Sequence, residues 1–127
     1  MKYKKSFILS GVVSIIALAV LILLPADSTA GEGAIASWYG GSEKLNKYTA
    51  NGEIFNAKSL TCASWYYPFN TCLKVVNIAN GKSVIVRVND RGPNKRLGRA
   101  IDLTRIAFAR IADTKDGLAL VRIEKIN

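Results

Sequence analysis

The chain has 127 residues, carries a formal net charge of +9 at pH 7 and contains no histidine. Without an imidazole, Ser-His-Asp and Cys-His nucleophiles lack their base, and the usual histidine or four-cysteine zinc sites cannot be assembled. Neither a P-loop nor a GxGxxG run occurs, so nothing in the chain supports phosphate-cradling nucleotide chemistry. We therefore expect a site without metal or cofactor that works through carboxylates.

The N-terminal segment has the organisation of an export signal. Three lysines precede an apolar run at residues 7–24, and small residues then lead to Ala30. This order is typical of a signal peptide, although the run also approaches the length of a bilayer span, so an uncleaved anchor is the alternative. We expect residues 1–30 to be this signal or anchor, and the only part of the chain that contacts a membrane.

Residues 31–127 are enough for one small domain with a modest core. We expect this domain to be exported to the periplasm, the cell wall or the medium. Its basic balance then suits an anionic wall polymer as partner, and export separates it from nucleic acid.

Short alternating apolar segments with turn signals follow one another along this domain. The segments predicted as strands are residues 34–39, 73–78, 83–89 and 118–126. Asn51-Gly52 predicts a tight turn, and Asn80-Gly81 predicts a hairpin between the second and third of these strands.

One segment near the C-terminus has helical spacing. Leu103, Ala107 and Ile111 recur every four residues, and Thr104 can cap the start of a helix. Together with the strands, this pattern predicts a mainly β protein, a small barrel with one short helix.

The two cysteines, Cys62 and Cys72, both lie in the domain expected to be exported. Thiols are commonly oxidised outside the cytoplasm, so a disulfide between them is predicted, with Cα atoms within about 7 Å. The alternative is a pair of buried thiols in a reducing environment.

Three carboxylates lie beside apolar segments. Asp90 follows the alternating valines of residues 84–88 in phase, which aims it at the apolar face, unless the chain already turns at Asp-Arg-Gly-Pro. Glu53 follows the predicted turn at the mouth of an apolar segment. Asp102 precedes the predicted helix, where a carboxylate favours the positive end of the helix dipole.

Four motifs occur in one order along the domain: A-S-W-Y-G (36–40), T-A-N-G-E-I-F (49–55), N-G-K-S-V-I-V-R-V-N-D-R-G-P (80–93) and G-R-A-I-D-L-T (98–104). Together they resemble the rare lipoprotein A family. The resemblance implies a double-psi β-barrel, the fold of barwin and expansins. It also implies a lytic transglycosylase that cuts the MurNAc to GlcNAc bond of peptidoglycan glycan strands.

By position, the resemblance implies that Asp90 is the catalytic acid and Glu53 an assisting carboxylate, facing one another across a single groove. The substrate-binding positions that it implies are Trp38, Tyr39, Thr49, Asn51, Ser64, Arg91 and Asp102. One departure is plain, because the family usually has T-A-A-H before L-P-F, and Ser64 stands here where that histidine would be.

The chemistry of the reaction agrees with a site of few groups. A hydrolase needs a second carboxylate to activate water or to attack the sugar. In a lytic transglycosylase, one acid protonates the leaving oxygen, and its conjugate base then takes a proton from the sugar's own 6-hydroxyl.

The alternative function is an expansin-like protein that binds and loosens wall polymers without cutting them. Aromatic residues suited to stacking on sugar faces are Trp38, Trp65, Tyr66 and Tyr67. A basic rim that would adsorb anionic polymer is expected from Arg87, Arg91, Lys95, Arg96 and Arg99.

Overall fold

The computed structural model describes residues 33–127, so the signal or anchor predicted at residues 1–30 lies outside the described residues. Between residues 33 and 127, no helix is long and apolar enough to cross a membrane. The strands are β1 (Ala34–Tyr39), β2 (Thr61–Ala63), β3 (Cys72–Asn77), β4 (Ser83–Asp90), β5 (Ile101–Thr104) and β6 (Ala119–Lys125). The helices are η2 (Lys95–Leu97), α2 (Arg105–Ala109) and η3 (Thr114–Asp116).

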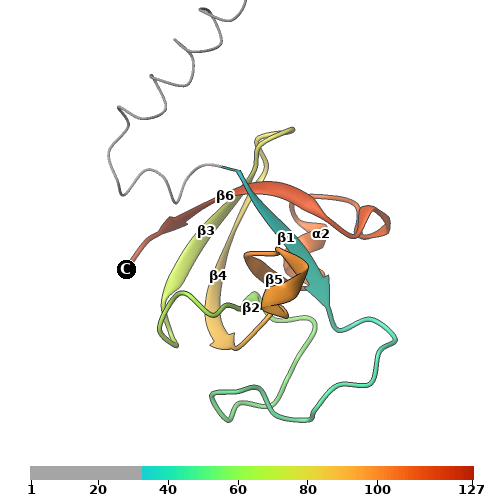
Figure 1. The fold of residues 1–127 in the computed structure, drawn as a ribbon, viewed down its shortest axis with the longest axis vertical. Coiled ribbons are helices and arrows are strands. Elements are labelled where there is room, and N and C mark those ends of the chain that lie inside the picture. Colours follow the sequence, from blue (N-terminus) through green and yellow to red (C-terminus); the bar gives the residue numbers. More distant parts are fainter. Residues whose placement is uncertain (1–32) are drawn as a thin grey trace, which may run out of the picture.

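The six strands close into a barrel in the order β1-β5-β2-β4-β3-β6 (Figure 1). The β1–β5 and β2–β4 pairs are parallel, and the other four pairs are antiparallel. The predicted mainly β barrel with one short helix is thereby confirmed. Sequence patterning missed β2 and β5, which are three and four residues long and therefore too short to show a clear period.

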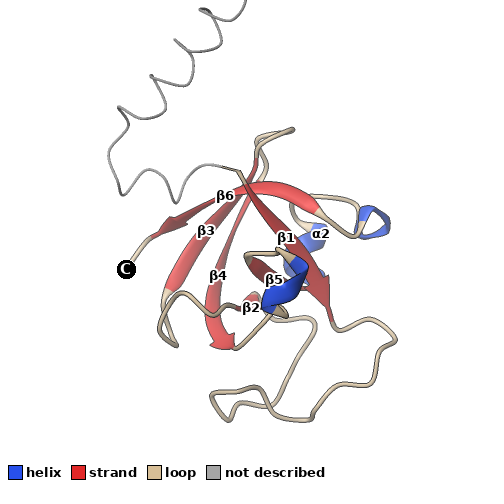
Figure 2. Cartoon of the chain, viewed as in Figure 1, coloured by secondary structure: helices blue, strands red, loops and turns tan. Residues whose placement is uncertain are grey.

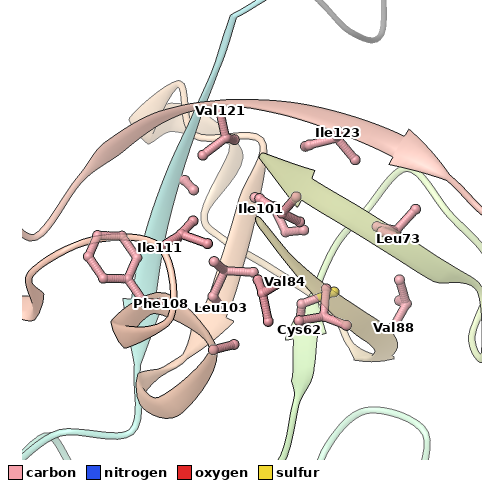
Figure 3. Close-up of a cluster of buried hydrophobic side chains, with 14 residues drawn as sticks. Cys62, Leu73, Val84, Val88, Ile101, Leu103, Phe108, Ile111, Val121 and Ile123 are labelled. Atoms are coloured by element: carbon pink, nitrogen blue, oxygen red, sulfur yellow. The ribbon is translucent and has the colours of Figure 1, made fainter. Parts of the chain in front are cut away.

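The barrel is held together by one apolar core. Val84, Val86 and Val88 alternate inward along β4, and the hairpin that joins β4 to β3 turns at Gly81 with φ of 75°, as Asn80-Gly81 predicted. Figure 3 shows the core side chains converging between the strands and α2. The buried cluster comprises Ala36, Cys62, Leu73, Val75, Val84, Val86, Val88, Ile101, Leu103, Ala107, Phe108, Ile111, Val121 and Ile123.

The helix is shorter than predicted, because Leu103 belongs to β5 and Ile111 follows the last helical residue. Thr104 caps α2 as predicted, with its Oγ1 accepting a hydrogen bond from the Ala107 amide at 3.4 Å. The expected position of Asp102 at the helix N-terminus is wrong, since Asp102 lies within β5.

The predicted disulfide is also wrong, because both cysteines are free. Strand β4 lies between them, with Cys62 paired to Val88 on one side and Cys72 paired to Arg87 on the other. Two inter-strand spacings imply roughly 9–10 Å between their Cα atoms, beyond the reach of a disulfide. Cys62 is also fully buried in the core, and its burial raises the pKa of its thiol.

A long loop, residues 40–60, connects β1 to β2 and reaches beyond one end of the barrel (Figure 2). It turns away from β1 at Gly40, which has φ of 96°. A Cβ at this position would lie 2.8 Å from Cζ of Phe55, so both the backbone conformation and the packing require glycine. This loop supplies one wall of the cavity described next.

Candidate functional site

A row of four residues crosses four neighbouring strands near the end of the barrel. Ser37 of β1 pairs with Asp102, Asp102 pairs with Ala63, and Ala63 pairs with Asp90. Paired residues in a sheet share a face, and Ala63 follows the core residue Cys62, so this row lies on the side opposite the core. The small Ala63 therefore separates two carboxylates that point the same way.

Asp90 reaches this face because of an irregularity in β4. Cys62 pairs with Val88 while Ala63 pairs with Asp90, so Asn89 is an extra residue that shifts the alternation. The prediction that Asp90 continues the inward valine phase is thus wrong. The turn alternative is wrong as well, since Asp90 is the last residue of β4.

Three donors converge on the Asp90 carboxylate. Its Oδ1 accepts from the amides of Ala50 and Arg91, both at 2.9 Å, and its Oδ2 accepts from the Tyr39 hydroxyl at 3.2 Å. Burial, together with the charge of Asp90, raises the pKa of the Tyr39 phenol, which therefore remains a donor. An acceptor-only carboxylate satisfies all three contacts.

Asp102 has a different environment. Its Oδ1 accepts one hydrogen bond, from the Ser37 hydroxyl at 3.0 Å. Burial raises the pKa of Asp102 to about 6, even though the Ser37 bond and the charge of Arg99 act in the opposite direction. The site thus contains one carboxylate that accepts three hydrogen bonds, Asp90, and one whose pKa is about 6, Asp102. Two carboxyl groups in such different environments are suited to acid and base chemistry.

Both carboxylates line a cavity of about 510 Å³ between the strand ends and the 40–60 loop. The described residues that line it are Tyr39, Leu45, Asn46, Tyr48, Thr49, Ala50, Phe55, Ala63, Asp90, Arg91, Gly92, Pro93, Asn94 and Asp102. Tyr39 and Phe55 pack against each other with ring centroids 4.9 Å apart. Sequence reasoning named Tyr39, Thr49, Asp90, Arg91 and Asp102, all of which contribute to this lining.

Sequence reasoning missed the apolar loop residues of the cavity, including Leu45, Tyr48 and Phe55. Their only signal in the sequence was the presence of apolar residues within a loop, and in the structure Leu45 and Tyr48 keep 39% and 56% of their surface accessible. No periodic pattern marks a residue that faces a cavity from an irregular loop.

Glu53 is not among the residues that line this cavity. Its carboxylate binds Arg87 of β4 through two bonds of 2.7 and 2.8 Å, and it also accepts from Asn89 at 3.1 Å and from Asn51 at 2.8 Å. These donors, Arg87 foremost, lower the pKa of Glu53 to about 2.

The same network fixes the turn that precedes Glu53. The Thr49 amide donates to the Glu53 carbonyl at 2.7 Å, and the Asn51 amide donates to the Asn89 carbonyl at 3.2 Å. Between these two anchors lies Ala50, whose amide binds Asp90. Glu53 therefore fastens to β4 the turn that delivers a donor to the candidate site.

Three other predicted binding residues lie outside the cavity lining. Trp38 faces the core side of β1, and its indole donates to the Thr114 carbonyl at 3.0 Å. Ser64 is buried, and its hydroxyl accepts from the Tyr66 amide at 3.1 Å. The side-chain amide of Asn51 donates a hydrogen bond to the Glu53 carboxylate at 2.8 Å.

The residues of the predicted basic rim have different partners in the structure. Arg87 is paired with Glu53, and Arg91 donates to the carbonyls of Ser64 and Tyr67 at 2.7 and 2.8 Å. Arg91 also stacks over Phe69, with 3.9 Å between the guanidinium carbon and the ring centroid. The remaining cations, Lys95, Arg96 and Arg99, form no ion pair with any described residue.

Comparison with known proteins assigns this barrel to a family. A family model described as lytic transglycolase matches residues 32–123. The chain belongs to this family. Its barrel is therefore a double-psi β-barrel, as the sequence motifs implied.

Similar curated proteins carry the name endolytic peptidoglycan transglycosylase RlpA. The chain is 46% identical to that of Campylobacter jejuni over 104 residues, which are 80% of this chain and 37% of the relative. It is 47% identical to that of Vibrio cholerae over 96 residues, covering 75% of this chain and 35% of the relative. The chain thus spans little more than a third of these relatives' length.

Solved structures with a similar fold include an expansin mutant of Clavibacter michiganensis in complex with cellohexaose. It has a TM-score of 0.59 and 18% identity, and the match covers 76% of this chain and 50% of that one. The Streptomyces papain inhibitor has a TM-score of 0.57 and 22% identity, with 75% and 93% covered. At these identities the likeness concerns the fold alone.

Proposed function

We propose that this chain is a lytic transglycosylase that cuts the MurNAc to GlcNAc bond of peptidoglycan and leaves a 1,6-anhydro-MurNAc end. The observation that carries the proposal is the pair Asp90 and Asp102 on the floor of one cavity, in a chain of the lytic transglycolase family. The named relatives act on peptidoglycan, and the cavity is large enough for sugar rings.

The two carboxylates take different roles in the proposed reaction. Asp102, with a pKa of about 6, holds a proton that it gives to the glycosidic oxygen as the C1–O bond breaks. Its conjugate base then accepts the proton of the 6-hydroxyl while that oxygen bonds to C1 and closes the anhydro ring. No water is consumed, so the site needs no water-activating base.

Asp90, which the sequence motifs implied as the acid, serves in this scheme as the fixed negative charge beside the reacting sugar. Its two oxygens are held by Ala50, Arg91 and Tyr39. A carboxylate held in place stabilises the positive charge that develops on the ring as the bond breaks.

Glu53 is proposed as a positioning residue in place of the assisting catalytic role that the motifs implied. A carboxyl with a pKa of about 2 holds no proton to donate near neutral pH. Its bonds to Arg87 and Asn51 hold the turn that carries the Ala50 amide to Asp90.

A double-mutant cycle tests this positioning role. We expect Glu53→Gln and Arg87→Gln each to lower kcat by about tenfold, and the double variant to be no worse than either, because all three release the same turn. In wild type the Ala50 amide, which is bonded to Asp90, should exchange its hydrogen slowly with solvent, and in both single variants this exchange should be faster. A Glu53→Gln variant that loses activity while Arg87→Gln keeps it would show that the Glu53 carboxylate itself takes part in the chemistry.

Export is part of the proposal, since peptidoglycan lies outside the cytoplasmic membrane. The lysines at residues 2–5 followed by the apolar run at 7–24 would supply the signal or the anchor. Lys95, Arg96 and Arg99, which form no ion pair within residues 33–127, support adsorption to anionic wall polymer.

Mass analysis of peptidoglycan incubated with the protein tests the function. We expect anhydro-muropeptides to accumulate with wild type and to be absent with an Asp90→Asn, Asp102→Asn double variant. Release of reducing ends without anhydro product would indicate a hydrolase and contradict the proposal.

The second candidate function is an expansin-like glycan binder that does not cut. The observation that favours it is Ser64, buried where the family usually has a histidine, which leaves the site without an imidazole. Glycan binding by wild type with no anhydro product would favour this candidate.

A further inference from the structure

An aromatic side chain is held at the edge of the cavity without being part of its lining. Trp65 keeps 45% of its surface exposed, although its indole Nε1 donates to the Pro93 carbonyl at 2.6 Å. Pro93 and the adjacent Asn94 line the cavity. The ring is therefore fixed to the rim of the site while much of its surface remains open to solvent.

Hydrogen bonds and a stacking contact hold the loop that carries Trp65 in place. Ser64 caps the turn through its hydroxyl, and Arg91 binds the carbonyls of Ser64 and Tyr67 while stacking over Phe69. Because these contacts hold the loop before any ligand arrives, binding at Trp65 costs little ordering of the protein. The preorganisation is typical of a binding surface.

A lysine lies beside the ring. The Lys95 ammonium lies 5.1 Å from the Trp65 ring centroid, and Lys95 is exposed. Among residues 33–127 it forms no ion pair with a carboxylate, so its charge is available to an anion. Arg96, also exposed and without an ion pair, follows it along η2.

We propose that Trp65 and Lys95 form a glycan subsite next to the catalytic cavity, which binds a pyranose ring bearing a carboxylate. The apolar face of the sugar packs on the indole, as aromatic side chains pack on other flat apolar surfaces. The ammonium of Lys95 moves from the ring to the carboxylate of the ligand, a stronger partner. This subsite rests on the proposed function, in which the carboxylate is that of the lactyl group of a peptide-free MurNAc residue.

Fluorescence offers a direct test, because the chain contains two tryptophans. In a full-length Trp38→Phe, Asp102→Asn variant, Trp65 is the single reporter and the glycan is not cut. We expect the emission of Trp65 to shift when peptide-free MurNAc-GlcNAc strands are added. A chitooligosaccharide of the same length, which lacks the carboxylate, should bind several-fold more weakly.

Calorimetry with the same two ligands compares the affinities of matched variants. Trp65→Ala is expected to weaken binding of the MurNAc strand by about tenfold, and Tyr66→Ala, the neighbouring exposed aromatic, by less than about twofold. Lys95→Met should remove the preference for the MurNAc strand over the chitooligosaccharide. Affinity unchanged by Trp65→Ala, or a preference unchanged by Lys95→Met, would overturn the subsite. These measurements detect binding, so they remain decisive even if no anhydro product forms and the proposed cleavage fails.

Discussion

Asp102→Asn is expected to lower the rate of anhydro-muropeptide release by about 10²–10⁴-fold, because the substitution removes the proton that the leaving oxygen needs. Asparagine has nearly the same size, and it can still accept the hydrogen bond from Ser37. Product release would be measured by chromatography and mass spectrometry over a range of pH.

The pH profile of the wild type tests whether Asp102 is the proton donor. The folded pKa of Asp102 is about 6, so its acid form declines about tenfold for each pH unit above that value. Activity should therefore be highest at or below pH 6 and fall as the pH rises. A wild-type rate that stays constant between pH 6 and 8 would exclude Asp102 as the proton donor in a rate-limiting step.

Stability provides the control that Asp102→Asn is folded. Burial raises the pKa of Asp102 above its unfolded value, so the folded state holds the proton more tightly and loses stability as the pH rises from about 4 through 6. The shift corresponds to roughly 2–3 kcal/mol at pH 7. Asp102→Asn should abolish this loss and be more stable than wild type at pH 7 in urea, while their difference shrinks at pH 4.

Asp90→Asn is expected to lower the rate by about 10²–10³-fold through loss of a charge that stabilises the developing positive sugar. Since the proton donor remains, the decline of activity above pH 6 should persist. The charge of Asp90 contributes to the raised pKa of Asp102, so the decline should begin at slightly lower pH.

Tyr39→Phe is the matched control for Asp90. It removes one of the three donors to the carboxylate but keeps the ring against Phe55 and keeps the negative charge. We expect a smaller loss of rate than for Asp90→Asn, measured on the same substrate. A Tyr39→Phe variant as impaired as Asp90→Asn would transfer the role of Asp90 to the phenol.

Much of the fold follows from local sequence. The alternating valines of residues 84–88, the Asn80-Gly81 turn and the Thr104 cap are short-range signals, and each gave the element that the structure contains. The family resemblance rested on motifs that surround the cavity, so it named five of the lining residues, although the strands β2 and β5 were missed.

The tertiary structure decided which of these residues meet. Asn89 is an extra residue opposite β2, and it turns Asp90 from the core to the cavity, which a periodic pattern cannot indicate because the irregularity depends on the partner strand. Asp102 lies beside Asp90 because both their strands pair with Ala63. Strand order likewise places β4 between the two cysteines and prevents their pairing.

The environments of the carboxylates were decided in the same way. The sequence determined that Glu53, Asp90 and Asp102 are the acidic residues beside apolar segments, but a pKa depends on burial and on partners from distant parts of the chain. Arg87, which lies 34 residues from Glu53, commits that carboxylate to an ion pair. Burial of Asp102 beside the cavity raises its pKa, because desolvation penalises the charged form, and this burial exists only in the folded chain.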